Sequence, residues 1–352
     1  MVFLEIPAGV GFSYTTSEDG LHTDDDTTAE NNYELIQQFL IRFPQYKSNS
    51  LYISSESYGG HYTATLAKKI VDYNNDANNN NPSLNFKGFM VGNPFIDVYS
   101  ATPSSFVTYW GHQVISKPTW DTYQASCLSL KDFSMEKCEM IFLKMYGEIG
   151  DLNPYALDYP VCVGDRRLKY GRGQRAALLN HILGSSSKLK EAIGLEVDGS
   201  YEPCEDDYST TYMNRADVKA AIHVKGDIAW EECSRSVRYS QLDSTKSMVP
   251  IYKELLDNNN NKLKIVVYSG DDDSVCSTEG TQHWIWGMDY EVFGEKWNQY
   301  KVNNQTAGYI TKWKNNLSFV TVRGAGHEVP TYKPEIALFL WNSYIDGKLT
   351  VV

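Results

Sequence analysis

The sequence lacks the features of a membrane or nucleic-acid-binding protein. No run approaches 18 consecutive apolar residues, so we predict no transmembrane helix. Basic residues are in the minority, with 32 Lys and Arg against 44 Asp and Glu, which gives a net charge of −12. The one basic run, residues 166–175, is short. Because an acidic surface repels nucleic acid and anionic lipid, we expect neither as a partner.

Two more absences concern cysteine pairs and the N-terminus. None of the six cysteines stands in a C-x-x-C pair, so a zinc ribbon has little support and we assign no metal site. Disulfides in a secretory or lysosomal compartment are the better interpretation, and sequons at Asn304 and Asn316 are compatible with glycosylation there. The first residues, "MVFLEIPAGVGFSY", have no basic n-region and therefore do not look like a signal peptide.

Apolar runs and helical patterns alternate along the 352 residues. The runs with strand character are residues 1–7, 50–54, 86–93, 263–270 and 317–327, and the helical patterns are residues 28–43, 63–73, 247–258 and 334–345. Continuous rather than alternating apolar strands between helices indicate an α/β protein, with a mostly parallel central sheet covered by helices on both faces.

The middle of the chain differs from the rest. Residues 111–215 hold four of the six cysteines, a serine run and the basic stretch, and they lack strong strands. We interpret this region as a cap inserted over one end of the sheet. The expected organisation is a first part of the core at residues 1–110, the cap at 111–215, and a second part of the core at 216–352.

One short stretch resembles a nucleophile elbow. "SSESYGGHY", residues 54–62, follows an apolar run and leads into a helical pattern. An elbow usually has the sequence G-x-S-x-G, because the strand and helix backbones pack closely around the serine. Here Ser55 replaces the first glycine. We expect some strain or a slight shift there, and we still expect Ser57 to be the nucleophile.

Three predicted strand ends carry groups that can act together. Ser57 follows one strand, Asp271 to Asp273 follow another, and His327 follows a third. Catalytic groups of an open α/β sheet lie beyond the carboxyl ends of its strands, and the order Ser, Asp, His is that of an α/β-hydrolase triad. His327 would remove the proton of Ser57, and an aspartate would orient the imidazole. The backbone N–H of Tyr58 would be one oxyanion donor.

Each of these groups also has a purely structural interpretation. A serine after a strand is usually a helix cap, and a histidine between glycines can be a turn residue. The aspartate triplet can be a solvated turn or a weak cation site. The combination at three strand ends, in the right order, is much more specific than any one of its members and favours a catalytic site.

The motifs "ESYGGHY", "GDDDSVC" and "GAGHEVP" resemble those of the serine carboxypeptidases, peptidase family S10. The resemblance covers nearly the whole chain and implies the α/β-hydrolase fold. It implies that Ser57 is the nucleophile, His327 the base and Asp273 the aspartate. It also implies that Glu56 recognises the free C-terminal carboxylate of the substrate, which requires a shared proton and predicts an acidic optimum. Cys276 corresponds to a thiol near the substrate, so mercurials should inhibit.

The resemblance also implies how the cysteines pair. The expected disulfides are Cys127 with Cys138 and Cys162 with Cys204. Family members carry a G-G-P-G-C-S-S segment upstream of "VFLEIPAGVGFSY", and nothing like it occurs here. That segment supplies the second oxyanion N–H, an asparagine for the substrate carboxylate and a cysteine. We therefore expect the N-terminal strands to be missing and Cys233 to have lost its usual partner.

These features predict a serine-type carboxypeptidase that needs no cofactor. Its substrates would be peptides or proteins with a free C-terminus, and its location the secretory pathway, either extracellular or lysosomal/vacuolar. Two alternatives stay open. One is a catalytically impaired truncated remnant that at most binds peptides. The other is a serine carboxypeptidase-like acyltransferase, although acyltransferases of the family tend to carry aspartate where this chain has Glu56.

Overall fold

A computed structural model describes residues 1–79, 81–127, 135–159, 206–231, 233–258 and 263–349. The chain forms two compact units. The first, here called the small unit, comprises residues 1–31, 150–153 and 159–243, and the second, the sheet unit, comprises residues 32–149, 154–158 and 244–352. In the part of the chain that the structure describes, no helix has the length and apolar character needed to cross a membrane.

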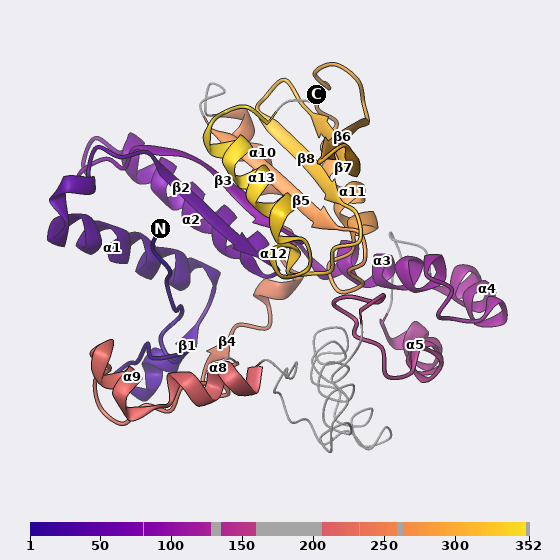
Figure 1. Cartoon of the computed structure of the whole chain (residues 1–352), viewed down its shortest axis with the longest axis horizontal. Coiled ribbons are helices and arrows are strands. Elements are labelled where there is room, and N and C mark those ends of the chain that lie inside the picture. The colour runs from indigo at the N-terminus through magenta and orange to yellow at the C-terminus, as the bar shows by residue number, and fades with distance from the viewer. Residues whose placement is uncertain (80, 128–134, 160–205, 232, 259–262, 350–352) are drawn as a thin grey trace. The chain divides into compact units, whose positions relative to one another are not determined.

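A six-stranded sheet is the centre of the sheet unit (Figure 1). Its strands follow the spatial order β2 (Leu51–Glu56), β3 (Phe86–Gly92), β5 (Lys264–Gly270), β8 (Leu317–Val322), β7 (Gln305–Lys312) and β6 (Asn298–Val302). The first four are parallel, and β7 and β6 continue the sheet as an antiparallel hairpin. Since all four parallel strands run the same way, their carboxyl ends lie along one edge of the sheet.

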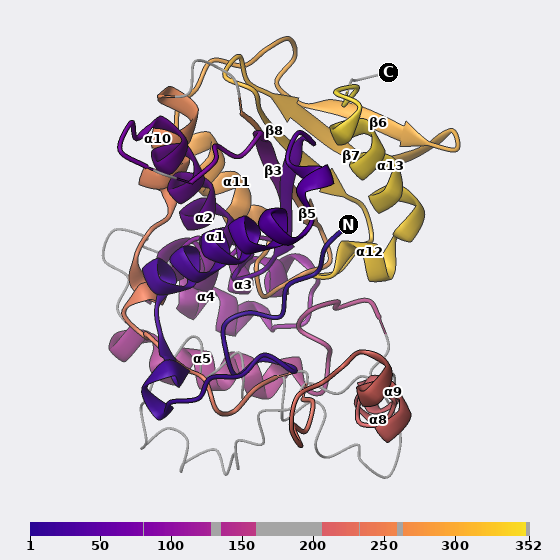
Figure 2. The same cartoon turned by 90° about the vertical axis from the view of Figure 1, so that its left-hand side faces the viewer.

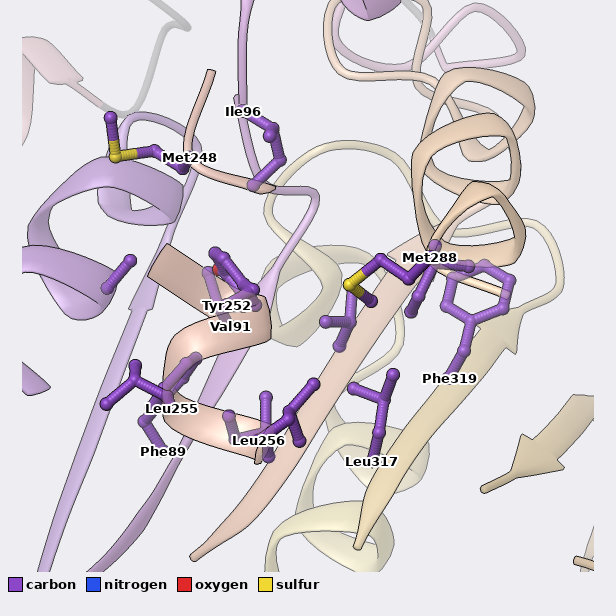
Figure 3. Packing of buried hydrophobic residues seen from close by; sticks show 14 of the residues in the cluster. Phe89, Val91, Ile96, Met248, Tyr252, Leu255, Leu256, Met288, Leu317 and Phe319 are labelled. Atoms are coloured by element: carbon purple, nitrogen blue, oxygen red, sulfur yellow. The ribbon is translucent and has the colours of Figure 1, made fainter. Parts of the chain in front are cut away.

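Helices cover both faces of this sheet (Figure 2). On one face Phe89, Val267 and Phe319 pack against α10 (Val249–Asp257) and α11 (Thr278–Gly287), with α2 (Gly59–Asn75) beside them (Figure 3). On the other face Met90 and Val320 pack against α12 (Val329–Tyr332) and α13 (Pro334–Ile345). Successive strand residues point to opposite faces, and both faces are buried, which explains the continuous apolar runs in the sequence.

Further helices complete the sheet unit. The elements are α1 (Asp25–Arg42), whose first residues belong to the small unit, η2 (Pro44–Tyr46), α3 (Val98–Gly111), α4 (Lys117–Ser126) and α5 (Met135–Ile149). Phe106 of α3 stacks on Phe142 of α5 with ring centroids 4.5 Å apart. Glu148 accepts hydrogen bonds from the backbone N–H and hydroxyl of Ser116, just before α4. These contacts bury the apolar faces of α3 and α5 against each other.

The small unit has little regular structure. Its elements are η1 (Glu18–Leu21), β1 (His22–Thr23), α8 (Asp206–Met213), α9 (Ala216–Ala221) and β4 (Arg238–Tyr239), with η3 (Asp243–Thr245) at its border. β1 and β4 form a short parallel pair. The Glu5 carboxylate accepts hydrogen bonds from the indole N–H of Trp230 and the backbone N–H of Phe12. Asp243, which is buried, accepts the backbone N–H of Asp25 at 2.9 Å.

Four of the five predicted strands are present and one is wrong. β2, β3, β5 and β8 overlap the apolar runs predicted at 50–54, 86–93, 263–270 and 317–327. Residues 1–6 form no strand; Met1 and Phe3 are exposed, and no described residue pairs with them in a ladder. A strand is stable only beside a neighbour that satisfies its backbone groups, so apolar composition alone was insufficient. The hairpin β6–β7 was not predicted.

Candidate active site

Ser57 occupies a sharp turn between β2 and α2. Its φ of 60° lies in the left-handed region, which serine rarely adopts, so the surrounding contacts must hold it there. The Ser57 N–H donates to the carbonyl of Gly92 at 3.0 Å. The Ser57 carbonyl accepts from Phe95 N–H at 2.8 Å and Gly60 N–H at 2.9 Å. These three bonds fix the backbone that presents the hydroxyl at the carboxyl end of β2.

The serine that replaces the first elbow glycine is accommodated by a glycine on the helix. A Cβ at Gly59 would collide with the Ser55 hydroxyl. The next residue, Gly60, is as restricted, because a Cβ there would collide with the carbonyl of Phe95. The Ser55 hydroxyl oxygen is buried and accepts no hydrogen bond from the described residues. Strand and helix therefore still approach closely, with Gly59 providing the space that Ser55 fills.

His327 and Asp273 form a short hydrogen bond that is shielded from water. His327 Nδ1 lies 2.6 Å from Asp273 Oδ2, and the exposed fractions of the two residues are 2% and 0%. Asp273 also accepts the backbone N–H of Val275 at 2.8 Å and of Cys276 at 3.1 Å. The backbone N–H of His327 donates to the carbonyl of Tyr155 at 2.7 Å. Both side chains are therefore held from several directions.

This geometry determines which imidazole nitrogen can act as a base. A carboxylate can only accept, so Nδ1 of His327 carries the hydrogen and Nε2 of the neutral ring has a lone pair. Nε2 is buried and makes no hydrogen bond with any described residue. The Ser57 hydroxyl lies beside the thiol of Cys276, and the backbone N–H of Cys276 donates to Asp273. Ser57 and His327 thus border the same small group of side chains around Asp273.

The three aspartates that follow β5 have three different partners. Asp271 accepts the backbone N–H of Gly324 at 2.6 Å. Asp272 lies 3.4 Å from His112 and accepts the backbone N–H of Asp158. Asp273 alone binds His327. Asp273 is the aspartate that the family resemblance implies, and neither Asp271 nor Asp272 is hydrogen-bonded to the imidazole of His327.

Glu56 and Glu328 place two further carboxyl groups beside this pair. Burial, followed by the charges of Glu328 and Asp273, raises the pKa of Glu56 to about 7, although His327 acts in the opposite direction. Burial raises the pKa of Glu328 as well. Glu56 is therefore largely protonated below neutral pH, so that it can donate a hydrogen bond to a carboxylate.

Burial and neighbouring charges shift the pKa of His327 in opposite directions. Burial lowers its pKa, but the charge and hydrogen bond of Asp273, with Glu328 and Glu56, outweigh burial and raise the pKa to about 9. Burial, with Asp273 and Glu56, raises the pKa of the Cys276 thiol well above its ordinary value. The thiol beside Ser57 is therefore protonated at neutral pH and is a weak nucleophile.

Tyr58, the predicted oxyanion donor, is the N-cap residue of α2. The helix has 17 residues, and its N-terminus carries a partial positive charge that favours an anion at the elbow. The ring of Tyr58 stacks on His61 and Phe95, with centroids 4.5 and 5.9 Å away. This packing fixes the backbone of Tyr58 next to Ser57.

Comparisons with known proteins identify the family of the chain. The sequence profile described as "Serine carboxypeptidase" matches residues 1–347. The chain belongs to the serine carboxypeptidase family. Among Arabidopsis thaliana relatives, serine carboxypeptidase 24 is 36% identical over 353 residues, a match that covers 99% of this chain and 72% of the relative. Putative serine carboxypeptidase-like 23 is 37% identical, with the same coverage.

A solved structure also resembles this member of the family in fold. It is Kex1Δp, a prohormone-processing carboxypeptidase from Saccharomyces cerevisiae, with a TM-score of 0.72 at 19% identity. The match covers 98% of this chain and 73% of that one. The likeness shows the α/β-hydrolase fold that the sequence motifs implied.

The structure adds Asn93 to the residues at the site. Asn93 follows β3, the strand between those that carry Ser57 and Asp273, and it is fully buried. Its side-chain NH2 donates to Asp273 Oδ2 at 2.8 Å and to the Gly270 carbonyl at 3.3 Å, and its oxygen accepts the Gly270 N–H at 2.9 Å. A polar residue at the end of a buried strand was the available signal. An asparagine at such a position usually begins a turn, so the residue type by itself does not indicate a site.

The predicted cysteine sites have different outcomes. Cys127 and Cys138 form a disulfide, as the resemblance implied. Cys162 and Cys204 lie outside the described residues, so their pairing stays a prediction. Cys233 lies in the small unit and is exposed. Cys276 is buried beside the Ser57 hydroxyl.

Proposed function

We propose that this chain is a serine-type carboxypeptidase that hydrolyses the C-terminal peptide bond of peptides and proteins. One observation carries the proposal: Nδ1 of His327 binds buried Asp273, which leaves the lone pair of Nε2 available to accept the proton of a serine. Family membership supports the same reaction class. No cofactor is needed for it.

The proposed reaction proceeds through an acyl-enzyme. Ser57 Oγ attacks the carbonyl carbon of the last peptide bond while its proton moves to His327 Nε2. The oxyanion that forms accepts a hydrogen bond from the backbone N–H of Tyr58 at the N-terminus of α2. His327 then protonates the departing amino group, and the C-terminal amino acid leaves. A water molecule, deprotonated by His327, releases the remaining peptide from Ser57.

Glu56 is proposed to select substrates with a free C-terminus. It ends β2 directly before the nucleophile, and its protonated form can donate to the substrate carboxylate. Ionised Glu56 would repel that carboxylate, so substrate binding should weaken above about pH 7. This supports the acidic optimum that we propose. The raised pKa of His327 opposes it, because a protonated imidazole cannot accept the proton of Ser57.

Two of the groups that hold the proton on His327 lose their charge in acid. Glu56 and Glu328 have raised pKa values themselves, so they become neutral at a higher pH than ordinary carboxyl groups do. Only Asp273 then supports the imidazolium, and burial favours the neutral ring. The pH dependence of kcat/KM measures this balance. A maximum below pH 7 supports the proposal, and a maximum at pH 8 or above overturns its acidic part.

A peptidase assay with an S57A control tests the activity. The purified chain is incubated with an N-blocked dipeptide, and free C-terminal amino acid is quantified. We expect release by the wild type, no release by S57A, and no release from the same dipeptide with an amidated C-terminus. Equal turnover of the amidated substrate would overturn the role of the free carboxylate.

Labelling and acceptor experiments separate the alternatives. A fluorophosphonate probe should modify Ser57 if the nucleophile is active, and no adduct with correctly folded protein would favour the impaired remnant. Transfer of the acyl group to an added alcohol in preference to water would identify an acyltransferase.

The disulfide and the sequons support a location in the secretory pathway, extracellular or lysosomal/vacuolar. The Cys127–Cys138 bond is of the kind that persists in oxidising compartments. Asn304 lies in the turn between β6 and β7, and Asn316 in the turn between β7 and β8. Both are exposed, as glycosylation requires. The cap boundaries at 111 and 215 also remain predictions.

A further inference from the structure

Three potential metal ligands meet on the sheet unit, outside the proposed reaction. His112 follows α3, Asp158 ends the segment 154–158, and Asp272 follows β5. One ligand atom from each lies within 4.8 Å of the other two. Asp272 is 2% exposed, whereas Asp158 is exposed and His112 half-buried. The cluster therefore has a buried acidic floor and an open side through which an ion can enter.

A hydrogen bond at Nδ1 of His112 leaves Nε2 as the atom that can bind a metal. Nδ1 lies 3.0 Å from the carbonyl of Thr108. Because a carbonyl only accepts, Nδ1 carries the hydrogen, and Nε2 of the neutral ring presents a lone pair to Asp272. A lone pair that faces a carboxylate is favourable only when a proton or a cation lies between them. An Nδ1–H donated to a backbone carbonyl is also the usual orientation of histidines that bind metals.

The distance between the ligand atoms also fits a bound metal. His112 Nε2 and Asp272 Oδ1 are 3.4 Å apart. A charged N–H···O bond is typically about 2.7–2.9 Å long. Two ligands of a tetrahedral ion with bonds of about 2.0–2.1 Å are separated by roughly 3.4 Å. The pair has the spacing of two zinc ligands.

We propose that His112, Asp158 and Asp272 bind a divalent transition-metal cation of the zinc type, with water as the fourth ligand. One imidazole and two carboxylates suit zinc, whereas calcium and magnesium prefer oxygen ligands alone. The ion would join the end of α3, the segment 154–158 and the turn after β5. Carbonyls of that segment also hold Ser274, through Pro154, and His327, through Tyr155.

Direct metal binding tests this site without using the peptidase activity. Untagged full-length protein is stripped with EDTA, desalted, and titrated with Zn²⁺ by equilibrium dialysis at pH 7.5. Co²⁺ is then used as a visible-absorption probe of coordination. We expect one high-affinity equivalent per chain and the absorption of tetrahedral Co²⁺. H112Q and D158N should each weaken the affinity by on the order of 100-fold.

The matched control is H283Q. His283 faces Glu279 on an exposed helix surface at 2.7 Å, so it is another His–carboxylate pair without the third ligand. H283Q should bind zinc like the wild type. Failure of the wild type to bind zinc, or unchanged binding by D158N, would overturn the proposal. If H112Q does not fold, the zinc affinity of D158N alone tests the proposal. D158N should fold, because the Asp158 side chain is exposed and its backbone N–H still donates a hydrogen bond to Asp272.

Discussion

Two histidine–aspartate pairs use adjacent aspartates of the turn after β5, and their environments differ. The inner pair, His327 and Asp273, is buried. Nδ1 of His327 lies 2.6 Å from Asp273 Oδ2 and donates its hydrogen to that carboxylate. The outer pair, His112 and Asp272, is partly exposed, and His112 Nε2 lies 3.4 Å from Asp272 Oδ1. Nδ1 of His112 donates to a backbone carbonyl instead of a carboxylate.

The hydrogen-bond partner of Nδ1 decides what each pair can do. In the inner pair Nδ1 binds the carboxylate, so Nε2 keeps a lone pair that can take a proton. In the outer pair Nε2 presents its lone pair to the carboxylates, where it can bind a cation. The same two residue types thus suit proton transfer in one place and ion binding in the other.

The largest effect is expected from aspartate-to-asparagine substitutions along the turn. D273N should lower kcat by on the order of 10⁴, because an amide can stabilise the wrong tautomer of His327 and cannot stabilise its charged form. D271N alters the hydrogen bond to Gly324, which does not involve His327, and should retain most activity. The measurement is kcat for release of the C-terminal amino acid by each variant.

D272N distinguishes the two pairs within this series. It should abolish the proposed zinc binding and leave fluorophosphonate labelling of Ser57 intact. Equal loss of kcat in D271N and D273N would contradict the assignment of Asp273 to the inner pair.

Removal of Asn93 should disturb the inner pair and leave the outer pair unchanged. N93A deletes a donor to Asp273, so kcat should fall roughly 10- to 100-fold, the loss expected for a hydrogen bond to a charged group. The carboxylate then binds the imidazolium more strongly, which raises the pKa of His327 and moves the acidic limb of the kcat profile to higher pH. A purely structural role would lower kcat without moving that limb.

T278V is the matched control for N93A. The Thr278 hydroxyl donates to the same Gly270 carbonyl as Asn93 and does not contact Asp273. The acidic limb of T278V should coincide with that of the wild type. A shift in both variants would mean that the Gly270 turn, rather than Asn93, positions Asp273.

E56Q should change how substrate binding depends on pH. In the wild type KM should rise about tenfold or more as the pH passes through about 7, because ionised Glu56 loses its donor and repels the substrate carboxylate. Glutamine keeps a donor at every pH, so KM of E56Q should be flat. A KM profile of E56Q that still rises through pH 7 would assign the titration to another group.

E328Q sharpens this test. The charge of Glu328 raises the pKa of Glu56, so its removal should lower that pKa. KM of E328Q should therefore still rise with pH, but should begin to rise at a lower pH than in the wild type.

The smallest effect is expected for the outer pair in the absence of metal. H112Q in EDTA should reduce the free energy of unfolding by about 1 kcal/mol or less, the usual value for a partly exposed ion pair. Asp272 keeps the Asp158 N–H as a partner in this variant. Urea unfolding at pH 7.5 measures the change, and added zinc should widen the difference from the wild type.

Much of the sheet was predictable because buried parallel strands have a simple signature. Runs such as "FKGFMVG" and "LKIVVYSG" are apolar on both faces, since helices cover both sides of β3 and β5. The segment "MVFLEIP" has the same composition and forms no strand. Composition reports how easily a segment is buried, but not whether a partner strand lies beside it.

The hairpin β6–β7 shows the opposite failure. Tyr300 is the one buried residue of β6, and both strands include polar residues such as lysine and glutamine, so they lack the continuous apolar run of the central strands. They join the sheet because β7 pairs with β8, a contact between residues that a local pattern does not reveal. Only the folded chain decides such pairing.

The sequence by itself determined the family, the sheet class and the order Ser57, Asp273, His327. Each of these depends on local motifs at strand ends, which survive in the linear order of residues. Tertiary structure alone decided that Asn93 binds Asp273 and that His112 approaches Asp272. These contacts join residues more than 150 positions apart, and their geometry depends on how strands and helices pack, which no local pattern records.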